Sequence, residues 1–212
     1  MSGLGLPYLG RPFFIERVQK VKLLEERIKE DGIVLEGNVL KVNSFLNHQI
    51  DPDLMAAIGE EFAKLFADSE ITRILTVESS GIAPAIMAGL ALHVPVVFAR
   101  KKKSSTLNEA VYSAEVFSYT KNVLNTISVD QKFLQADDKV LIIDDFLANG
   151  QAVLGLIEIC HQAQAQIVGA GIVVEKSFQQ GAKLIRQAGV RLESLARIAA
   201  FVDGQVKFVG EE

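Results

Sequence analysis

The segment that decides the fold reads VLIIDDFLANGQA and spans residues 140–152. Its first four residues are all apolar, which predicts a short buried strand from Val140 to Ile143. Two acids, Asp144 and Asp145, stand at the end of this strand, and a short loop then leads into a helix expected over 150–162. This order is typical of an open α/β sheet, in which ligands bind beyond the carboxyl ends of the strands.

The loop between this strand and helix has the chemistry of an anion site. The first turn of a helix offers unpaired backbone N–H groups and the positive end of the helix dipole. Gly150 has no Cβ, so the backbone can come close to a phosphate. The carboxylates of Asp144 and Asp145 suit sugar hydroxyls or a metal-bound water. On these residues alone, a solvated strand end followed by an ordinary helix cap remains the alternative.

The rest of the chain continues the alternation of strand and helix patterns. After residue 50, apolar runs alternate with helical periodicity, which predicts a mainly parallel sheet. Asp51 and Pro52 predict the start of a helix, because a capping carboxylate precedes a proline at the first helical position. The other expected elements are a helix over 21–31, two strand pieces within 33–45 about the turn at 37–38, strands over 71–77, 94–98 and 167–174, an antiparallel hairpin of 110–119 with 122–129, and a final helix and strand within 178–200.

The composition fits one globular domain. Of the 212 residues, 49% are hydrophobic and 23% are charged, and the net charge of −4 gives no overall reason to expect nucleic-acid or membrane binding. The longest uncharged run, 81–99, contains Pro84 and Pro95, so it predicts a helix and a buried strand rather than a membrane span. The single cysteine, Cys160, lies in an apolar series and is expected to be buried, which fits a reducing cytoplasm. The three histidines show no metal-ligand spacing.

Residues 1–20 do not fit this scheme, since they mix glycines and prolines with scattered aromatic residues. We expect an extra tail of weak order here, followed by a single domain over 21–212. Our hypothesis is that the native protein starts at the codon of Val21, read as methionine, so that residues 1–20 are a gene-prediction artefact. A real tail that folds over a dimer contact is the alternative.

The deciding segment resembles the phosphoribosyl pyrophosphate (PRPP) signature of the type I phosphoribosyltransferases. From Val21 onward the chain is similar to the xanthine branch of that family, because further segments match in order. These segments are LKVNSFLNHQIDP (40–52), ESSGIAP (78–84), VVFARK (96–101) and EKSF (175–178). Many members have threonines in the phosphate loop, whereas this chain has Ala148, Asn149 and Ala152. This departure from the general pattern matches the xanthine branch and leaves phosphate binding to backbone N–H groups.

The resemblance implies a fold and a place for PRPP. The fold would be a mainly parallel sheet flanked by helices, with a small hood built from both ends of the domain and a flexible antiparallel hairpin. The 5-phosphate would bind to the loop Ala148, Asn149, Gly150, Gln151 and Ala152. Pyrophosphate would bind to the turn Glu78, Ser79, Ser80 and Gly81, which in this family often contains a cis peptide bond, and to Lys101 and Lys103 of the basic run 100–103.

The resemblance also implies catalytic and base-binding residues. Asp144, Asp145 and Lys101 would be catalytic: the acids would contact the ribose directly or through Mg²⁺-bound water, and the lysine would neutralise the leaving group. Lys176 would donate to the 6-oxo group of a purine. Leu40, Asn47 and Phe178 would complete the base site, although Phe178 is equally suited to a place in the core.

The implied activity is transfer of 5-phosphoribosyl from PRPP, with Mg²⁺, to an oxopurine, with xanthine the expected base. The family is homodimeric, so a homodimer is expected. Two alternatives stay open at this point. The chain could salvage hypoxanthine and guanine, or adenine, instead of xanthine. It could also be a PRPP-sensing transcription regulator without catalysis, although residues 1–20 are too few for a winged helix and the chain is not basic.

Overall fold

A computed structural model of the chain describes residues 13–101, 110–118 and 122–211. At its centre lies a six-stranded sheet in the order β10-β9-β8-β7-β3-β4. The strands are β3 (Arg73–Val77), β4 (Val96–Ala99), β7 (Lys139–Leu147), β8 (Gln166–Lys176), β9 (Leu192–Val202) and β10 (Gln205–Phe208). Only the pairing of β10 with β9 is antiparallel in this sheet. The expectation of a mainly parallel sheet is confirmed.

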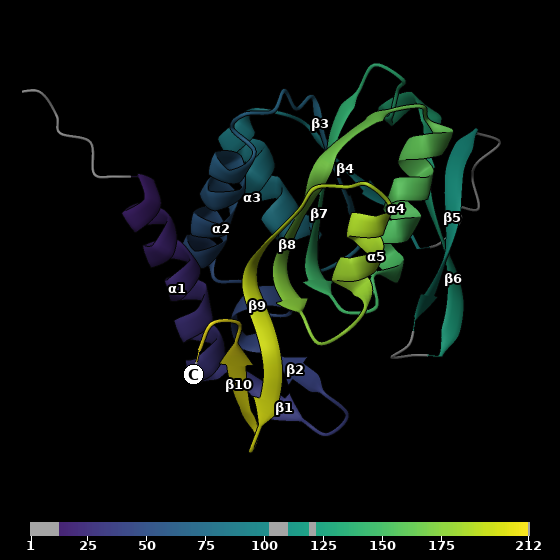
Figure 1. Cartoon of the computed structure of the whole chain (residues 1–212). Coiled ribbons are helices and arrows are strands. Elements are labelled where there is room, and N and C mark those ends of the chain that lie inside the picture. Colours follow the sequence, from purple (N-terminus) through teal and green to yellow (C-terminus); the bar gives the residue numbers. More distant parts are fainter. Residues whose placement is uncertain (1–12, 102–109, 119–121, 212) are drawn as a thin grey trace, which may run out of the picture.

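Helices cover both faces of the sheet (Figure 1). The helices α1 (Phe13–Asp31), α2 (Pro52–Leu65) and α3 (Ile82–Leu92) lie on one face, and α4 (Gln151–Gln162) and α5 (Gly181–Gln187) lie on the other. Each face has its own apolar core. The first core includes Phe62 and Phe66, and the second includes Leu156, Ile159 and the buried Cys160. Burial raises the pKa of the Cys160 thiol to about 12, as expected of a cysteine that serves as a small apolar residue.

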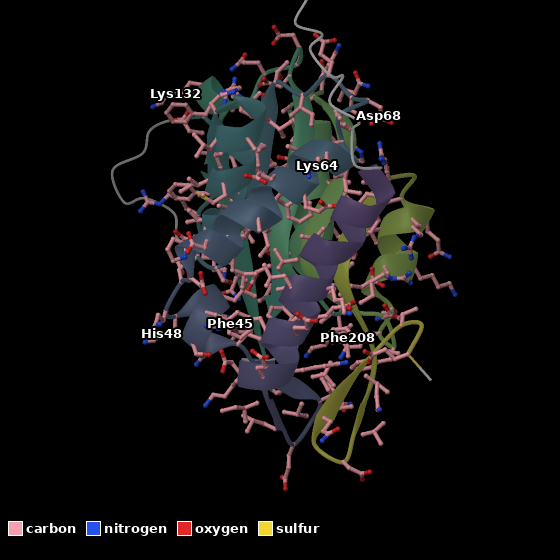
Figure 2. The ribbon with its side chains drawn as sticks, turned by 90° about the vertical axis from the view of Figure 1, so that its left-hand side faces the viewer. Phe45, His48, Lys64, Asp68, Lys132 and Phe208 are labelled. Carbon is pink, nitrogen blue, oxygen red and sulfur yellow. The ribbon has the colours of Figure 1, made fainter. Side chains whose placement is uncertain are left out.

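The hood lies at the lower end of the molecule in Figure 1, where β1 (Ile33–Leu35), β2 (Val39–Lys41) and a π-helical turn (Asn43–Asn47) lie near the β10 end of the sheet. Figure 2 shows Phe45 and Phe208 at this end of the molecule, far from Lys64 and Asp68. The turn predicted at Gly37 and Asn38 is confirmed: both residues have positive φ, in a three-residue loop of Glu36, Gly37 and Asn38 that joins Leu35 to Val39. The two strand pieces predicted within 33–45 are confirmed as β1 and β2, and the chain leaves β2 at Lys41 to bury Phe45 and Leu46 in the π-helical turn.

The predicted antiparallel hairpin is confirmed as β5 (Val111–Ser118) paired with β6 (Val123–Asp130). It stands at the outer side of α4 (Figure 1). Gly155 of α4 permits this packing, because a Cβ there would lie 2.6 Å from Cγ2 of Val116. A bridge between Arg100 and Ser128 joins the hairpin to the segment that leaves β4. The predicted turn at Thr120 and Lys121 lies outside the described residues.

Two element boundaries differ clearly from the sequence-based predictions, and one strand was not predicted. Helix α1 begins at Phe13 rather than Val21, so part of the segment expected to be a tail is helical. Strand β7 continues to Leu147, so the acids at 144 and 145 lie within the strand instead of after it. Strand β10 was not predicted, and its ladder with β9 closes the hood end of the sheet. The hypothesis that the native protein starts at Val21 stays a prediction.

Asp51 caps α2 as the sequence predicts. Its carboxylate accepts hydrogen bonds from the backbone N–H groups of Asp53 and Leu54, each at 3.1 Å. Pro52 occupies the first helical position, where its missing N–H costs nothing.

No helix of the described residues is long and apolar enough to cross a membrane.

Candidate active site

A cleft of about 280 Å³ opens at the carboxyl ends of the central strands. It brings together Lys101, Asp144 and the loop 148–152, three parts of the predicted site that lie far apart in sequence. The hairpin forms the opposite wall, which the sequence analysis missed. The residues of this wall are Val116, Phe117, Asn125 and Ile127. The sequence pattern predicted only the two strands, since nothing in the sequence showed which face of the hairpin would meet the cleft.

The predicted phosphate loop, residues 148–152, is fixed from behind by α5. Gly150 has φ of 81°, a left-handed conformation that favours glycine. A Cβ at Gly150 would lie 3.0 Å from Cα of Gly181, so the two backbones are in contact. The N–H of Gly181 donates to the carbonyl oxygen of Ala148 at 3.0 Å, and a Cβ on Gly181 would lie only 2.4 Å from that oxygen. Gly181 therefore holds the phosphate loop in place, although the sequence analysis did not single it out.

Asp144 is a buried carboxyl group at the floor of the cleft. Its Oδ1 accepts a hydrogen bond from the backbone N–H of Asp145 at 3.0 Å. Burial is the main cause that raises the pKa of Asp144 well above its ordinary value, and the neighbouring charge of Asp145 adds to the rise. The ammonium group of Lys101 acts in the opposite direction. A cation brought into the cleft would likewise favour the ionised form of Asp144.

The predicted pyrophosphate turn meets Asp144 through Gly81. A Cβ on Gly81 would lie 2.3 Å from Oγ1 of Thr76 and 3.0 Å from Oδ1 of Asp144. Glycine is therefore required where the turn after β3 passes the acid on β7. The peptide bond between Glu78 and Ser79 is cis, as expected of the family. Lys103, the other lysine predicted for pyrophosphate, lies outside the described residues.

Lys176 links the core to the hood. Its Nζ donates to the carbonyl oxygen of Asn38 at 2.8 Å, in the turn between β1 and β2. The ammonium group also lies about 6 Å from the ring centroids of Phe146 and Phe201. Burial lowers the pKa of Lys176. Because Phe146 also lines the cleft, Lys176 stands next to the space expected to hold PRPP.

The other predicted base residues, Leu40, Asn47 and Phe178, are not among the residues that line the cleft. Leu40 is buried on β2, and Asn47 is exposed at the end of the π-helical turn. Phe178 is 40% exposed and makes an edge contact with Phe201 at 5.6 Å between centroids. Phe178 is therefore not a core residue, which leaves its ring available to a ligand.

A buried carboxylate that the sequence analysis missed as a functional group supports the loop between Lys176 and Gly181. Glu175 is 1% exposed and accepts hydrogen bonds from the hydroxyls of Ser177 and Ser194, each at 2.6 Å. The guanidinium of Arg197 lies 3.5 Å from the same carboxylate. A buried charge needs such partners, and here they tie the loop that follows β8 to β9.

Comparison with known proteins identifies the family. A model of the phosphoribosyl transferase domain matches residues 47–202. The xanthine phosphoribosyltransferase of Ligilactobacillus salivarius is 69% identical over 192 residues, which cover 91% of this chain and 100% of that protein. This chain is a member of the xanthine phosphoribosyltransferase family. The family protein of Lactiplantibacillus plantarum is 66% identical over 189 residues, 89% of this chain and 97% of that protein.

Solved structures agree on the phosphoribosyltransferase fold. Adenine phosphoribosyltransferase from Rhodothermus marinus has a TM-score of 0.70 at 22% identity and covers 85% of this chain and 99% of that one. The enzyme from Giardia lamblia, in complex with 9-deazaadenine, has a TM-score of 0.65 at 26% identity over 76% of this chain and 87% of that one. At 22% identity, the match to the Rhodothermus marinus structure shows only that the fold is shared.

We predict that Gly181→Ala will impair PRPP binding selectively. The new methyl group would press on the carbonyl of Ala148 and displace the phosphate loop, and misplacement by about 1 Å can cost on the order of 100-fold in rate. Steady-state kinetics should show a rise of at least about tenfold in the KM for PRPP with little change in the KM for the base.

Ala182→Gly is the matched control for this substitution. It removes one methyl group at the next position of the same helix, at a cost in stability of about 1 kcal/mol, and leaves Gly181 unchanged. An equal rise in KM in both variants would show that Gly181 acts through the stability of α5 and not through the loop.

We predict that Asp144→Asn will stabilise the free protein while it lowers activity. The folded-state pKa of Asp144 is raised, so the folded protein binds more protons than the unfolded chain and its stability falls as the pH rises toward that pKa. Asparagine does not ionise, so the difference in Tm between variant and wild type should grow as the pH rises above about 4. Thermal unfolding without Mg²⁺ or PRPP measures it. A difference in Tm that does not change with pH would contradict the prediction.

Proposed function

We propose that this enzyme transfers the 5-phosphoribosyl group of PRPP to xanthine, forming xanthosine 5′-monophosphate and pyrophosphate in purine salvage. The observation that supports it best is the meeting of Lys101, Asp144 and the phosphate loop in one cleft beside Lys176, in a chain 69% identical to a named xanthine phosphoribosyltransferase. The carbon–oxygen bond to pyrophosphate breaks, a purine nitrogen bonds to the same carbon, and that base loses a proton.

The lone buried cysteine fits the cytoplasm as the site of this reaction.

The residues have separate tasks in this proposal. Backbone N–H groups of the loop 148–152 bind the 5-phosphate at the start of α4. Lys101 and the backbone of residues 79–81 neutralise the departing pyrophosphate. Asp144 and Asp145 orient the ribose hydroxyls and supply negative charge near the positive charge that develops on the sugar. Most of the rate would come from positioning and electrostatics.

Mg²⁺ would arrive bound to PRPP. Among the described residues, no group of three or more His, Cys, Asp or Glu side chains could hold a metal ion by itself. The carboxylates of Asp144 and Asp145 are oxygen donors of the kind that Mg²⁺ prefers, and Mg²⁺ commonly keeps several of its waters. We therefore assign these acids to water-mediated contact with the metal of the substrate.

Base selection would depend on Lys176. Its ammonium group can donate but cannot accept hydrogen bonds, so it favours a 6-oxo group over the 6-amino group of adenine. In the free protein it already donates to a carbonyl oxygen, that of Asn38. A base bound here would lie beside the exposed ring of Phe178 and below the hood residues Leu40 and Asn47.

We predict that nucleotide formation from PRPP and Mg²⁺ will be fastest with xanthine when xanthine, guanine, hypoxanthine and adenine are compared. Lys176→Met, which keeps the aliphatic stem, should lower kcat/KM for xanthine about 10–100-fold, since a hydrogen bond to a charged group is lost. The KM for PRPP should change little. Lys176→Arg should recover part of the loss.

Two outcomes would contradict the assignment. Preference for another base would leave the transfer reaction in place but overturn the base site. Absence of turnover with all four bases, in folded protein that binds PRPP in calorimetry, would favour the PRPP-sensing regulator.

We also propose a homodimer, formed through α3 and β4. Helix α3 carries no charged residue, and its Ile86 and Leu90, one turn apart, are 52% and 64% exposed. Phe98 on β4, which packs beside α3, is also exposed. A helix that is apolar all round is normally covered on all sides, and a second copy of the chain would cover this one.

We predict that the double substitution Ile86→Glu and Leu90→Glu will convert a dimer to a monomer, as measured by light scattering after size-exclusion chromatography. Val209→Glu, at an exposed apolar residue beyond β10, is the control and should leave the mass unchanged. A monomeric wild type, or a dimer that survives the double substitution, would refute the proposed interface.

A further inference from the structure

Glu78 makes two contacts that join the pyrophosphate turn to the segment leaving β4. Its Oε1 accepts a hydrogen bond from the backbone N–H of Lys101 at 2.6 Å. Its own backbone N–H donates to the carbonyl oxygen of Ala99 at 3.0 Å. The first residue of the turn after β3 is thus bound by both backbone and side chain to residues 99–101.

The chemistry of the Glu78 side chain does not suit direct contact with pyrophosphate. An ionised carboxylate only accepts hydrogen bonds, and the oxygens of pyrophosphate are acceptors as well. The negative charges of the carboxylate and of pyrophosphate would also repel each other in direct contact. The carboxylate of Glu78 instead has a donor in the protein, and a hydrogen bond in which the acceptor is ionised is among the stronger kinds.

The backbone of Lys101 is held from two sides. The preceding residue, Arg100, exchanges backbone hydrogen bonds with Ser128 of the hairpin, at 2.9 and 3.0 Å. Glu78 then holds the N–H of Lys101 itself. The long side chain of Lys101, which lines the cleft with Asp144, extends from this fixed point. A lysine side chain samples many rotamers, so the position of its ammonium group is poorly defined unless its backbone is fixed. The two anchors on the backbone of Lys101 therefore limit the space that its ammonium group can reach.

We propose that Glu78 is a positioning residue, which anchors the backbone of Lys101 so that its ammonium group reaches the pyrophosphate of PRPP, and that Glu78 is not itself a ligand of pyrophosphate. This inference rests on the proposed function of the cleft. It replaces the expectation that Glu78 binds pyrophosphate by an indirect role through Lys101.

The test separates the effect of side-chain length from the effect of charge at position 78. Glu78→Gln keeps the length and the acceptor oxygen but removes the charge, whereas Glu78→Asp keeps the charge but is one methylene shorter. Positioning predicts that Glu78→Ala and Glu78→Asp raise the KM for PRPP about tenfold, that Glu78→Gln recovers most of this loss, and that the KM for xanthine stays within about twofold in all three. Thermal unfolding of each variant checks that it folds.

A double-mutant cycle with Lys101→Ala tests whether Glu78 acts through that side chain. Lys101→Ala keeps the backbone N–H but removes the ammonium group. If Glu78 acts only by placing this group, Glu78→Ala should change the KM for PRPP less than twofold in the Lys101→Ala background. Additive losses, or an Asp variant more active than the Gln variant, would overturn the proposal and assign Glu78 a direct role with the metal or pyrophosphate.

The same variants distinguish failure of this inference from failure of the proposed function. If the wild type binds PRPP with Mg²⁺ but turns over no base, calorimetric Kd values for PRPP replace KM in the cycle, and the same pattern of coupling is expected. If the wild type binds no PRPP, both the proposed function and the role of Glu78 are refuted.

Discussion

The parallel pairing of β7 with β3 on one side and β8 on the other is the constraint on which the site depends. Parallel strands end at the same edge of the sheet, so three separate turns of the chain meet there. These turns carry the residues 78–81, 148–152 and 176–181. Three turns on one edge of the sheet could together bind a molecule with phosphates at two ends and a base beside it, as proposed above, whereas a single turn could not. The close contact of Gly150 with Gly181 then fixes the second turn against the third.

Much of the fold could be predicted from the sequence because its elements are strongly patterned. The apolar run before Asp144 is continuous, as expected of a central parallel strand, and Asp51 with Pro52 marks a helix start that the structure confirms. The boundaries were less predictable. The acids at 144 and 145 looked like the end of a strand, yet the ladder with β8 continues to Leu147 because Phe146 and Leu147 pair with Val174 and Glu175.

The site could be predicted only as far as local motifs extend. The phosphate loop and Asp144 belong to one continuous segment, so their meeting in the cleft followed from the sequence. The contributions of Gly181, Glu175 and the hairpin wall depend on contacts between distant segments. Gly181, for example, leaves room for the carbonyl of Ala148, which lies far from it in the sequence. No local sequence pattern indicates such a contact. The role of Glu78 was carried over from a motif, whereas its hydrogen bond to Lys101 is visible only in three dimensions.

The hydrogen bond from Lys176 to the Asn38 carbonyl oxygen gives this ammonium group an acceptor inside the protein. The hood presents to the lysine the same kind of oxygen that an oxopurine would present, so the lysine is never desolvated without a partner. If Lys176 binds the base as proposed, an oxopurine would offer the ammonium group another carbonyl oxygen at small net cost, whereas the 6-amino group of an aminopurine would offer it no acceptor. Discrimination between bases would then depend on whether the base supplies an acceptor of the kind that the hood already gives to this lysine.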